Sequence, residues 1–139
     1  MYTALDLAKY VVTKCTKEDA PISNLQLQKI LYYIQKTFLQ ERHVRGFSDE
    51  IEAWQFGPVV PNVYFHFSGF GAMPISMEYI DVDIDPLDAS LINPLIEDKR
   101  KLNPWELVEE THKPGGAWQT IYDDFFAGKV IPIELIQKD

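Results

Sequence analysis

Residues 53–64 read AWQFGPVVPNVY, and the signals in this stretch do most to decide the fold. Residues 50–56 alternate polar and apolar side chains and are aromatic at their end, which predicts a short strand or extended segment. Gly57-Pro58 then marks a turn. Pro61 suits the first turn of a helix, because its fixed φ is helical and its missing N–H needs no partner there. The stretch therefore predicts an extended segment, a turn and the start of a helix.

Two longer helices are expected before this stretch. The first spans residues 3–17, with Thr3 and Asp6 at capping-box spacing and an apolar stripe on one side. The second begins at Ser23, where Gln26 completes a capping box, and its broad apolar face extends to about residue 41. A helix with so wide an apolar face belongs near the centre of a domain.

Shorter elements are expected after this stretch. The helix begun at Pro61 covers residues 62–67, and residues 79–84 alternate like a second strand that could pair with residues 50–56. A further helix is predicted with Asp88 as its cap and Ala89 as its first residue, and Pro94 should kink or break it. Other helices are predicted over residues 103–112 and 118–126 and after Pro132.

These patterns predict a mainly α fold over residues 1–139. It is a compact single-domain helical bundle of about five to seven helices with a small two-stranded β element. With 139 residues, 46% of them hydrophobic, the chain can bury a core of its own.

The charge balance restricts the classes of partner. A net charge of −8 disfavours nucleic-acid phosphates and anionic membranes and favours a basic partner. No apolar run is long enough to span a membrane. The single cysteine, Cys15, predicts a reducing compartment, so the expected location is the cytoplasm. Cys15 lies on the apolar stripe of the first helix and is interpreted as a core residue.

No catalytic, metal or cofactor motif stands out. The three histidines, His43, His66 and His112, are not at metal-ligand spacing, so neither a metal nor a cofactor is expected. Residues 81–85 resemble the start of a calcium loop, but the required glycine and glutamate are absent, which favours a solvated acidic edge. Residues 99–101, KRK, are interpreted as a solvated helix end.

Three blocks of sequence carry a family resemblance. Residues 25–33, LQLQKILYY, and residues 52–64, EAWQFGPVVPNVY, are followed by Thr111-His112. Together they resemble the Panacea domain of SocA-like antitoxins, also known as phage-associated or GepA-type proteins. The family's later Pro-Trp step differs here, because three residues separate Pro114 from Trp118. The positions that match the motif or that we expect to be structural are Tyr32, Trp54, Gly57, Pro58, Pro61, Tyr64, His112 and Trp118.

The resemblance implies an antitoxin that neutralises a cognate toxin by direct protein–protein binding, without enzymatic activity. We expect that toxin to be basic. Two alternatives share the idea of a binding surface: a proteolytic adaptor, and a phage-encoded regulator that binds a host protein. A hydrolase built around His66 or His112 is a third alternative, motivated by the histidines alone. Whether the protein forms a homodimer is left open.

The surplus of aromatic residues suggests where a partner binds. A short helix cannot bury Tyr64, Phe65 and Phe67 on one narrow face, and exposed aromatic side chains often anchor interfaces. The expected partner-binding residues are Gln28, Lys29, Asn62, Phe65 and His66. We expect Trp54 and Gly57 to build the fold instead, with Trp54 in the core.

Overall fold

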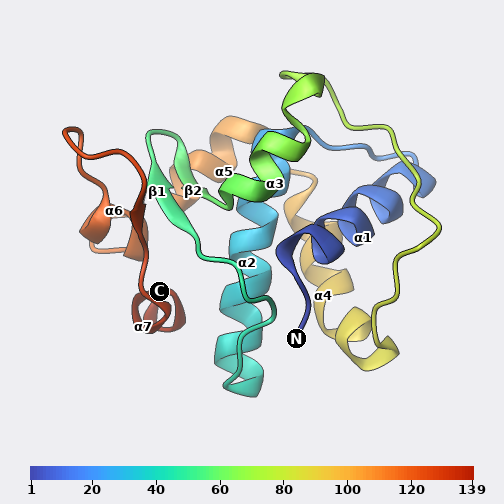
Figure 1. The fold of residues 1–139 in the computed structure, drawn as a ribbon, viewed down its shortest axis with the longest axis horizontal. Coiled ribbons are helices and arrows are strands. Elements are labelled where there is room, and N and C mark those ends of the chain that lie inside the picture. The colour runs from blue at the N-terminus through green and yellow to red at the C-terminus, as the bar shows by residue number, and fades with distance from the viewer.

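Helix α2 runs through the middle of the molecule, and most other helices and the sheet pack against it (Figure 1). The computed structural model describes all residues 1–139 and confirms a mainly helical fold with a small antiparallel sheet. The α-helices are α1 (Ala4–Lys17), α2 (Asn24–Arg42), α3 (Pro61–His66), α4 (Pro86–Lys99), α5 (Pro104–Thr111), α6 (Ala117–Ile121) and α7 (Ile133–Lys138). The strands are β1 (Glu52–Trp54), β2 (Gly57–Val59) and β3 (Lys129–Val130), and a 3₁₀ helix, η1, covers Ser68–Phe70. None of these helices combines the length and the apolar content of a membrane span.

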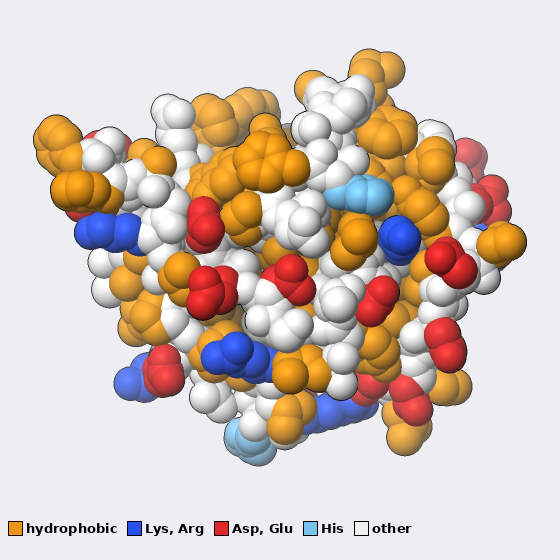
Figure 2. All heavy atoms as spheres, viewed as in Figure 1, with side chains coloured by type: hydrophobic (Ala, Val, Ile, Leu, Met, Phe, Trp, Pro, Cys, Tyr) orange, Lys and Arg blue, Asp and Glu red, His pale blue; other side chains and the backbone are white.

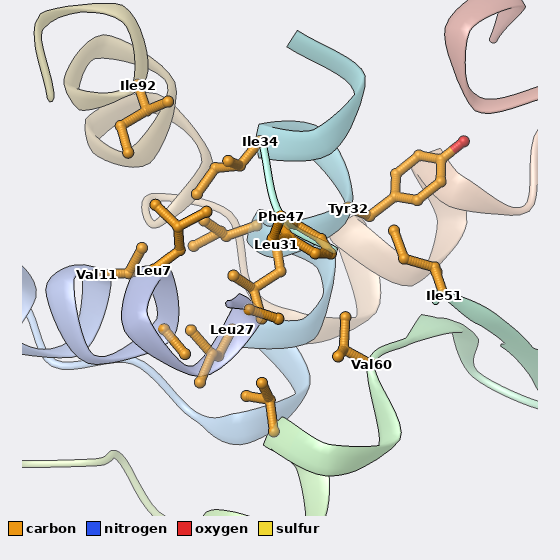
Figure 3. Packing of buried hydrophobic residues seen from close by; sticks show 14 of the residues in the cluster. Leu7, Val11, Leu27, Leu31, Tyr32, Ile34, Phe47, Ile51, Val60 and Ile92 are labelled. Atoms are coloured by element: carbon orange, nitrogen blue, oxygen red, sulfur yellow. The ribbon is translucent and has the colours of Figure 1, made fainter. Parts of the chain in front are cut away.

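The core is one continuous cluster of 27 buried residues that extends from Ala4 on α1 to Ile136 on α7. Figure 3 shows Leu7 of α1 and Ile92 of α4 on one side of α2, with Tyr32 of α2 pointing to the other side. Cys15 is fully buried in this cluster, as its position on the apolar stripe of α1 predicts. Burial of apolar surface on both sides of α2 is the main favourable contribution to folding.

Three of the predicted helix starts are confirmed by their capping bonds. In each, a side-chain oxygen of the cap accepts a backbone N–H three residues on, and the side chain of that later residue accepts the backbone N–H of the cap. The pairs are Thr3 with Asp6 on α1, Ser23 with Gln26 on α2, and Asn103 with Glu106 on α5. Pro61 occupies the first turn of α3, and Pro132 caps α7.

The predicted pairing of residues 50–56 with residues 79–84 is wrong. Strands β1 and β2 form an antiparallel hairpin within residues 52–59, and β3 pairs with the other edge of β1. The turn therefore lies at residues 55–56, and Gly57-Pro58 begins the second strand. Residues 79–84 form an arm without a strand partner, whose Tyr79 N–H donates to Oγ1 of Thr13 at 2.9 Å. Only Tyr79 and Ile84 of the arm pack against the core, and Ile80 is fully exposed, so the alternation of apolar residues here does not mark a sheet.

Two helix boundaries also differ from the prediction. Helix α4 begins at Pro86 with Asp85 as its cap, because Asp88 instead accepts a hydrogen bond from the Tyr2 hydroxyl and pairs with Arg42. Pro94 lies inside this helix without ending it. Helix α6 ends at Ile121, because the backbone is already extended at the next residue.

Residues 122–128 form a loop, although the sequence predicts that the helix continues to residue 126. Oδ1 of Asp123 accepts the backbone N–H of Phe125 at 2.8 Å, a local turn that competes with helical bonding. Phe125 and Phe126 are consequently exposed on this loop.

Candidate functional site

A row of polar side chains on α2 is buried beneath the β1–β2 hairpin. Gln28 is 1% exposed and Lys29 is fully buried. The prediction that these two residues flank a partner-binding surface is therefore wrong. Their face of α2 points toward residues 57–64 and is covered by them, as the hydrogen bonds below show.

Gln28 and Asn24 hold the link between β2 and α3. The N–H of Val60 donates to Oε1 of Gln28 at 2.9 Å, and Nε2 of Gln28 donates to Oδ1 of Asn24 at 3.0 Å. Nδ2 of Asn24 in turn donates to the carbonyl of Tyr64 at 3.0 Å. Two side chains of α2 thus satisfy backbone groups that secondary structure does not pair, and they fix where α3 starts.

Lys29 hydrogen-bonds the same segment nearer its start, in strand β2. Its Nζ donates to the carbonyl of Pro58 at 3.2 Å, and no carboxylate forms an ion pair with it. Burial without an opposite charge lowers the pKa of Lys29 from its ordinary 10.5 to about 7. The side chain serves as a hydrogen-bond donor to the hairpin and is inaccessible to a partner.

Gly57 is required by this arrangement. Its φ is +112°, a backbone conformation that residues with side chains rarely adopt. A methyl group at this position would lie 2.7 Å from Cε of Lys29 and 2.9 Å from Oγ1 of Thr111. The first, second and third blocks of the sequence motif therefore meet at this glycine.

The third block packs against the hairpin through stacked rings. The rings of His112 and Trp118 are parallel with centroids 3.5 Å apart, and Nε1 of Trp118 donates to the carbonyl of Trp54 at 2.7 Å. Burial, with a smaller effect from the charge of Lys29, lowers the pKa of His112, and its Nε2 is buried without a partner. The stack therefore ties α5 and α6 to β1.

The C-terminal helix is fixed to α2 by Tyr32. The Tyr32 hydroxyl donates to Oδ2 of Asp139 at 2.6 Å, and Oδ1 of Asp139 accepts the N–H of Ala117 at 3.0 Å. Tyr32 is thus a core residue with one structural hydrogen bond.

Above this buried layer lies an open pocket of about 410 Å³, which we call the aromatic groove. It lies between the hairpin, α3 and the start of α5, and its large hydrophobic wall residues are Leu25, Trp54, Phe56, Val59, Tyr64 and Trp105. Figure 2 shows hydrophobic side chains gathered over the hairpin and α3. The pocket volume lies in the range of sites that take a ligand or a partner's side chain.

Large aromatic side chains stand exposed around the groove. Phe56 is 46% exposed, Trp105 is 60% exposed, and their rings make an edge contact at 5.4 Å. Phe65, on α3, is 63% exposed, and its ring centroid lies 6.0 Å from that of Trp54. Isolated exposed apolar residues are ordinary, but a contiguous aromatic group is characteristic of an interaction surface.

Trp54 belongs to this surface, and its predicted place in the core is wrong. It is only partly buried, its ring meets Tyr64 edge-on at 5.1 Å, and its Nε1 donates to Oε1 of Glu52 at 2.9 Å. The inward position of β1 is taken by Ala53, because successive side chains of a strand alternate between faces.

The other predicted partner-binding residues lie together on α3. Asn62, Phe65 and His66 are all exposed, on the helix that borders the groove. Val63 is the one buried residue of that helix. Their role in binding stays a prediction.

The sequence reading did not single out Phe56 and Trp105 as surface residues. For Trp105, helical spacing offered a signal, because its position in the first turn of α5 lies off the face formed by the buried residues Leu107, Val108 and Thr111. Phe56 could not be placed without the hairpin register, which puts it in the turn.

The geometry offers the hydrolase hypothesis no support. Neither His66 nor His112 has a hydrogen bond to a carboxylate, which a histidine base needs for orientation. No group of three or more His, Cys, Asp or Glu side chains is arranged to hold a metal ion.

The protein is thus a helical domain with an exposed aromatic surface, and buried polar side chains of α2 hold that surface in place. Residues 27–119 match the family profile described as "Antitoxin SocA-like, Panacea domain". The chain is 35% identical over 130 residues to Antitoxin SocA of Caulobacter vibrioides (strain NA1000 / CB15N), across 83% of this chain and 68% of that protein. The chain belongs to the SocA-like antitoxin family with a Panacea domain. No solved structure matches it.

Proposed function

We propose that this protein is an antitoxin that neutralises a cognate toxin by binding it directly in the cytoplasm. Membership of an antitoxin family supports the role, and the net charge of −8 favours a basic toxin as the partner. Residues 1–139 act as one Panacea-type unit, since a single core draws on residues from every α-helix except α5, from Ala4 on α1 to Ile136 on α7.

The observation that carries this proposal is the exposed aromatic surface formed by Phe56, Phe65 and Trp105. Each is at least 46% exposed, although burying such a ring gains free energy. Aromatic residues of this kind are typical anchors of protein interfaces. Asn62 and His66 stand beside Phe65 on α3 and supply polar groups at the edge of the contact.

The buried layer beneath gives this surface a defined shape before the toxin arrives. Val60 and Tyr64 are held through their backbone by Gln28 and Asn24, and Pro58 is held by Lys29. A surface that is already ordered loses less conformational entropy on binding, so more of the contact energy contributes to affinity.

Co-expression with the product of the adjacent gene tests the proposal. The expected result is restored growth and a complex that elutes as one peak from a sizing column. Absence of both growth rescue and complex would contradict the proposal. A constant toxin level in rescued cells indicates neutralisation by binding, whereas a falling level indicates delivery to a protease.

A further inference from the structure

The wall of the aromatic groove contains no charged residue, but two glutamates that follow its wall residue Trp105 on α5, Glu106 and Glu109, form what we call the acidic border. Glu109 follows Trp105 by one helical turn on α5, so the two side chains lie on the same side of that helix. Glu106 lies next to Trp105, and it reaches back to the N–H of Asn103 at 3.2 Å. Neither glutamate forms an ion pair within the chain.

The basic residues elsewhere do not offset this border. Most of the lysines and arginines whose side chains contact another residue form ion pairs with carboxylates of the chain, and Lys29 is buried. The paired ones are Lys14, Arg42, Lys99, Arg100, Lys113 and Lys129. The predicted basic stretch at residues 99–101 is largely neutralised in this way, since its first two residues pair with Glu110 and Glu18. At the start of α5 the unpaired Glu106 and Glu109 outnumber the one unpaired base, Lys101, two residues before the cap, so this end of the groove carries a net negative charge and attracts cations.

We propose that the aromatic groove binds a segment of the toxin in which a large apolar side chain lies next to a lysine or arginine. The inference rests on the proposed function and names the chemistry of its partner. The apolar side chain fills the pocket between Trp54, Tyr64 and Phe56. The cation reaches Glu106 and Glu109 and lies over the exposed ring of Trp105, where a cation–π contact adds to the attraction.

The same features disfavour other occupants. A nucleic acid would bring phosphates against the glutamates of α5. A second copy of this chain would place a net charge of −8 against another −8, with like charges opposed around both grooves. A basic segment with an apolar anchor meets both the pocket and its border.

Photocrosslinking tests the location. p-Benzoylphenylalanine is introduced at position 56 or at position 105, and in a control at position 125, whose Phe is 90% exposed on the loop before β3. Each variant is co-purified with the product of the adjacent gene, irradiated and analysed by mass spectrometry. Positions 56 and 105 should both capture one contiguous toxin segment that contains a large apolar residue within a few positions of a lysine or arginine.

The outcomes separate the two proposals. If no complex forms with the unmodified chain, the proposed function fails. If the complex forms but only position 125 is captured, or the captured segment lacks either the apolar or the basic residue, the groove inference fails while the proposed function stands.

Charge removal tests the acidic border. The double variant Glu106→Gln and Glu109→Gln keeps the capping box of α5, because glutamine caps as glutamate does. Its association with the toxin should slow by about threefold to tenfold at low salt, and the difference should disappear at high salt. Glu134→Gln, on α7 away from the groove (Figure 1), is the matched control and should leave the rate unchanged. An unchanged rate in the double variant, with an unchanged melting temperature, would overturn the electrostatic part of the inference.

Discussion

The two faces of the β1–β2 hairpin and its link to α3 reverse the usual distribution of side chains. Beneath this segment, Gln28 and Lys29 are polar and completely buried. Above it, Phe65 and Trp105 are aromatic and more than half exposed. Burying polar groups and exposing aromatic rings both cost free energy. Residues at such positions therefore usually have a specific structural or binding role.

The difference between the two faces separates the tasks. The buried polar groups hydrogen-bond backbone atoms of residues 58–64, so their task is to fix the shape of one segment. The exposed rings make few contacts within the chain and are free to make contacts with a partner. Substitutions below the hairpin should therefore change stability, and substitutions above it should change binding.

The largest effect is expected from the pH dependence of Lys29. The folded protein has a pKa of about 7 at this amine, while an unfolded lysine titrates near 10.4. Between these values the unfolded chain binds a proton that the folded chain does not, so the free energy of unfolding rises with pH, by up to about 5 kcal/mol in total. Below pH 7 both states are protonated, and this contribution is constant.

Urea unfolding at pH 7 and at pH 8.5 measures this dependence below the range where lysines with ordinary pKa values titrate. The wild-type protein should gain up to about 2 kcal/mol across that interval. Lys29→Met keeps the length of the side chain and should show no such gain. An equal pH dependence in both proteins would show that Lys29 is not the source.

The next largest effect is expected from Gln28→Ala. The substitution leaves the Val60 N–H and Oδ1 of Asn24 without this partner inside the protein, which should cost about 3 kcal/mol of unfolding free energy. Gln40→Ala is the matched control on the same helix, since Gln40 is exposed and its single bond reaches the carbonyl of Gln137. Denaturant unfolding should show a loss below about 1 kcal/mol for the control. Similar losses for both variants would contradict the bracing role.

Trp105→Ala should act on binding instead of stability. Removing this exposed ring should weaken the toxin complex by about 30-fold or more, equivalent to about 2 kcal/mol. The free energy of unfolding should change by less than about 1 kcal/mol, since the side chain is 60% exposed. Calorimetric titration and urea unfolding of the same preparation give the two values. A loss of stability larger than the loss of affinity would show that the ring serves the fold.

Phe65→Ala should produce the smallest effect, at the edge of the surface. A weakening of about fivefold to tenfold is expected, because Phe65 does not line the groove as Trp105 does and packs against Trp54 and Tyr64 at its edge. Phe125→Ala, at a ring that is 90% exposed outside the groove, should leave toxin affinity unchanged. If Phe125→Ala weakens the complex as much as Phe65→Ala does, the interface includes the loop before β3.

The helices could be predicted from sequence because their signals are local. Thr3, Ser23 and Asn103 each stand three residues before the side chain that completes the capping box, and all three boxes form. The strands could not be paired correctly, because residues 79–84 and residues 50–56 both alternate, while only the second segment contains a paired strand, β1. Pairing depends on which segments meet in space, and alternation alone does not report it, since Ile80 of the first segment is fully exposed.

Only part of the candidate site could be predicted, because spacing identifies motif positions but does not show whether they are buried. The motif positions Gly57, Pro58 and His112 were found, but whether Lys29 and Trp54 face inward or outward could not be read from spacing. Lysine is almost never fully buried, so a surface position was the ordinary expectation for Lys29. The burial of Lys29 follows from Gly57, whose missing side chain lets the hairpin approach α2 closely.

The helical class, the three capped helix starts and membership of the antitoxin family can all be read from the chain, since these depend on neighbouring residues or on a motif. Which polar residues are buried and which aromatic residues are exposed becomes known only from the folded arrangement. Exposure is a property of packing between segments distant in the chain, as where α5 brings Trp105 to the ring of Phe56. The groove exists because β2, α3 and α5 meet above α2, and no local pattern encodes that meeting.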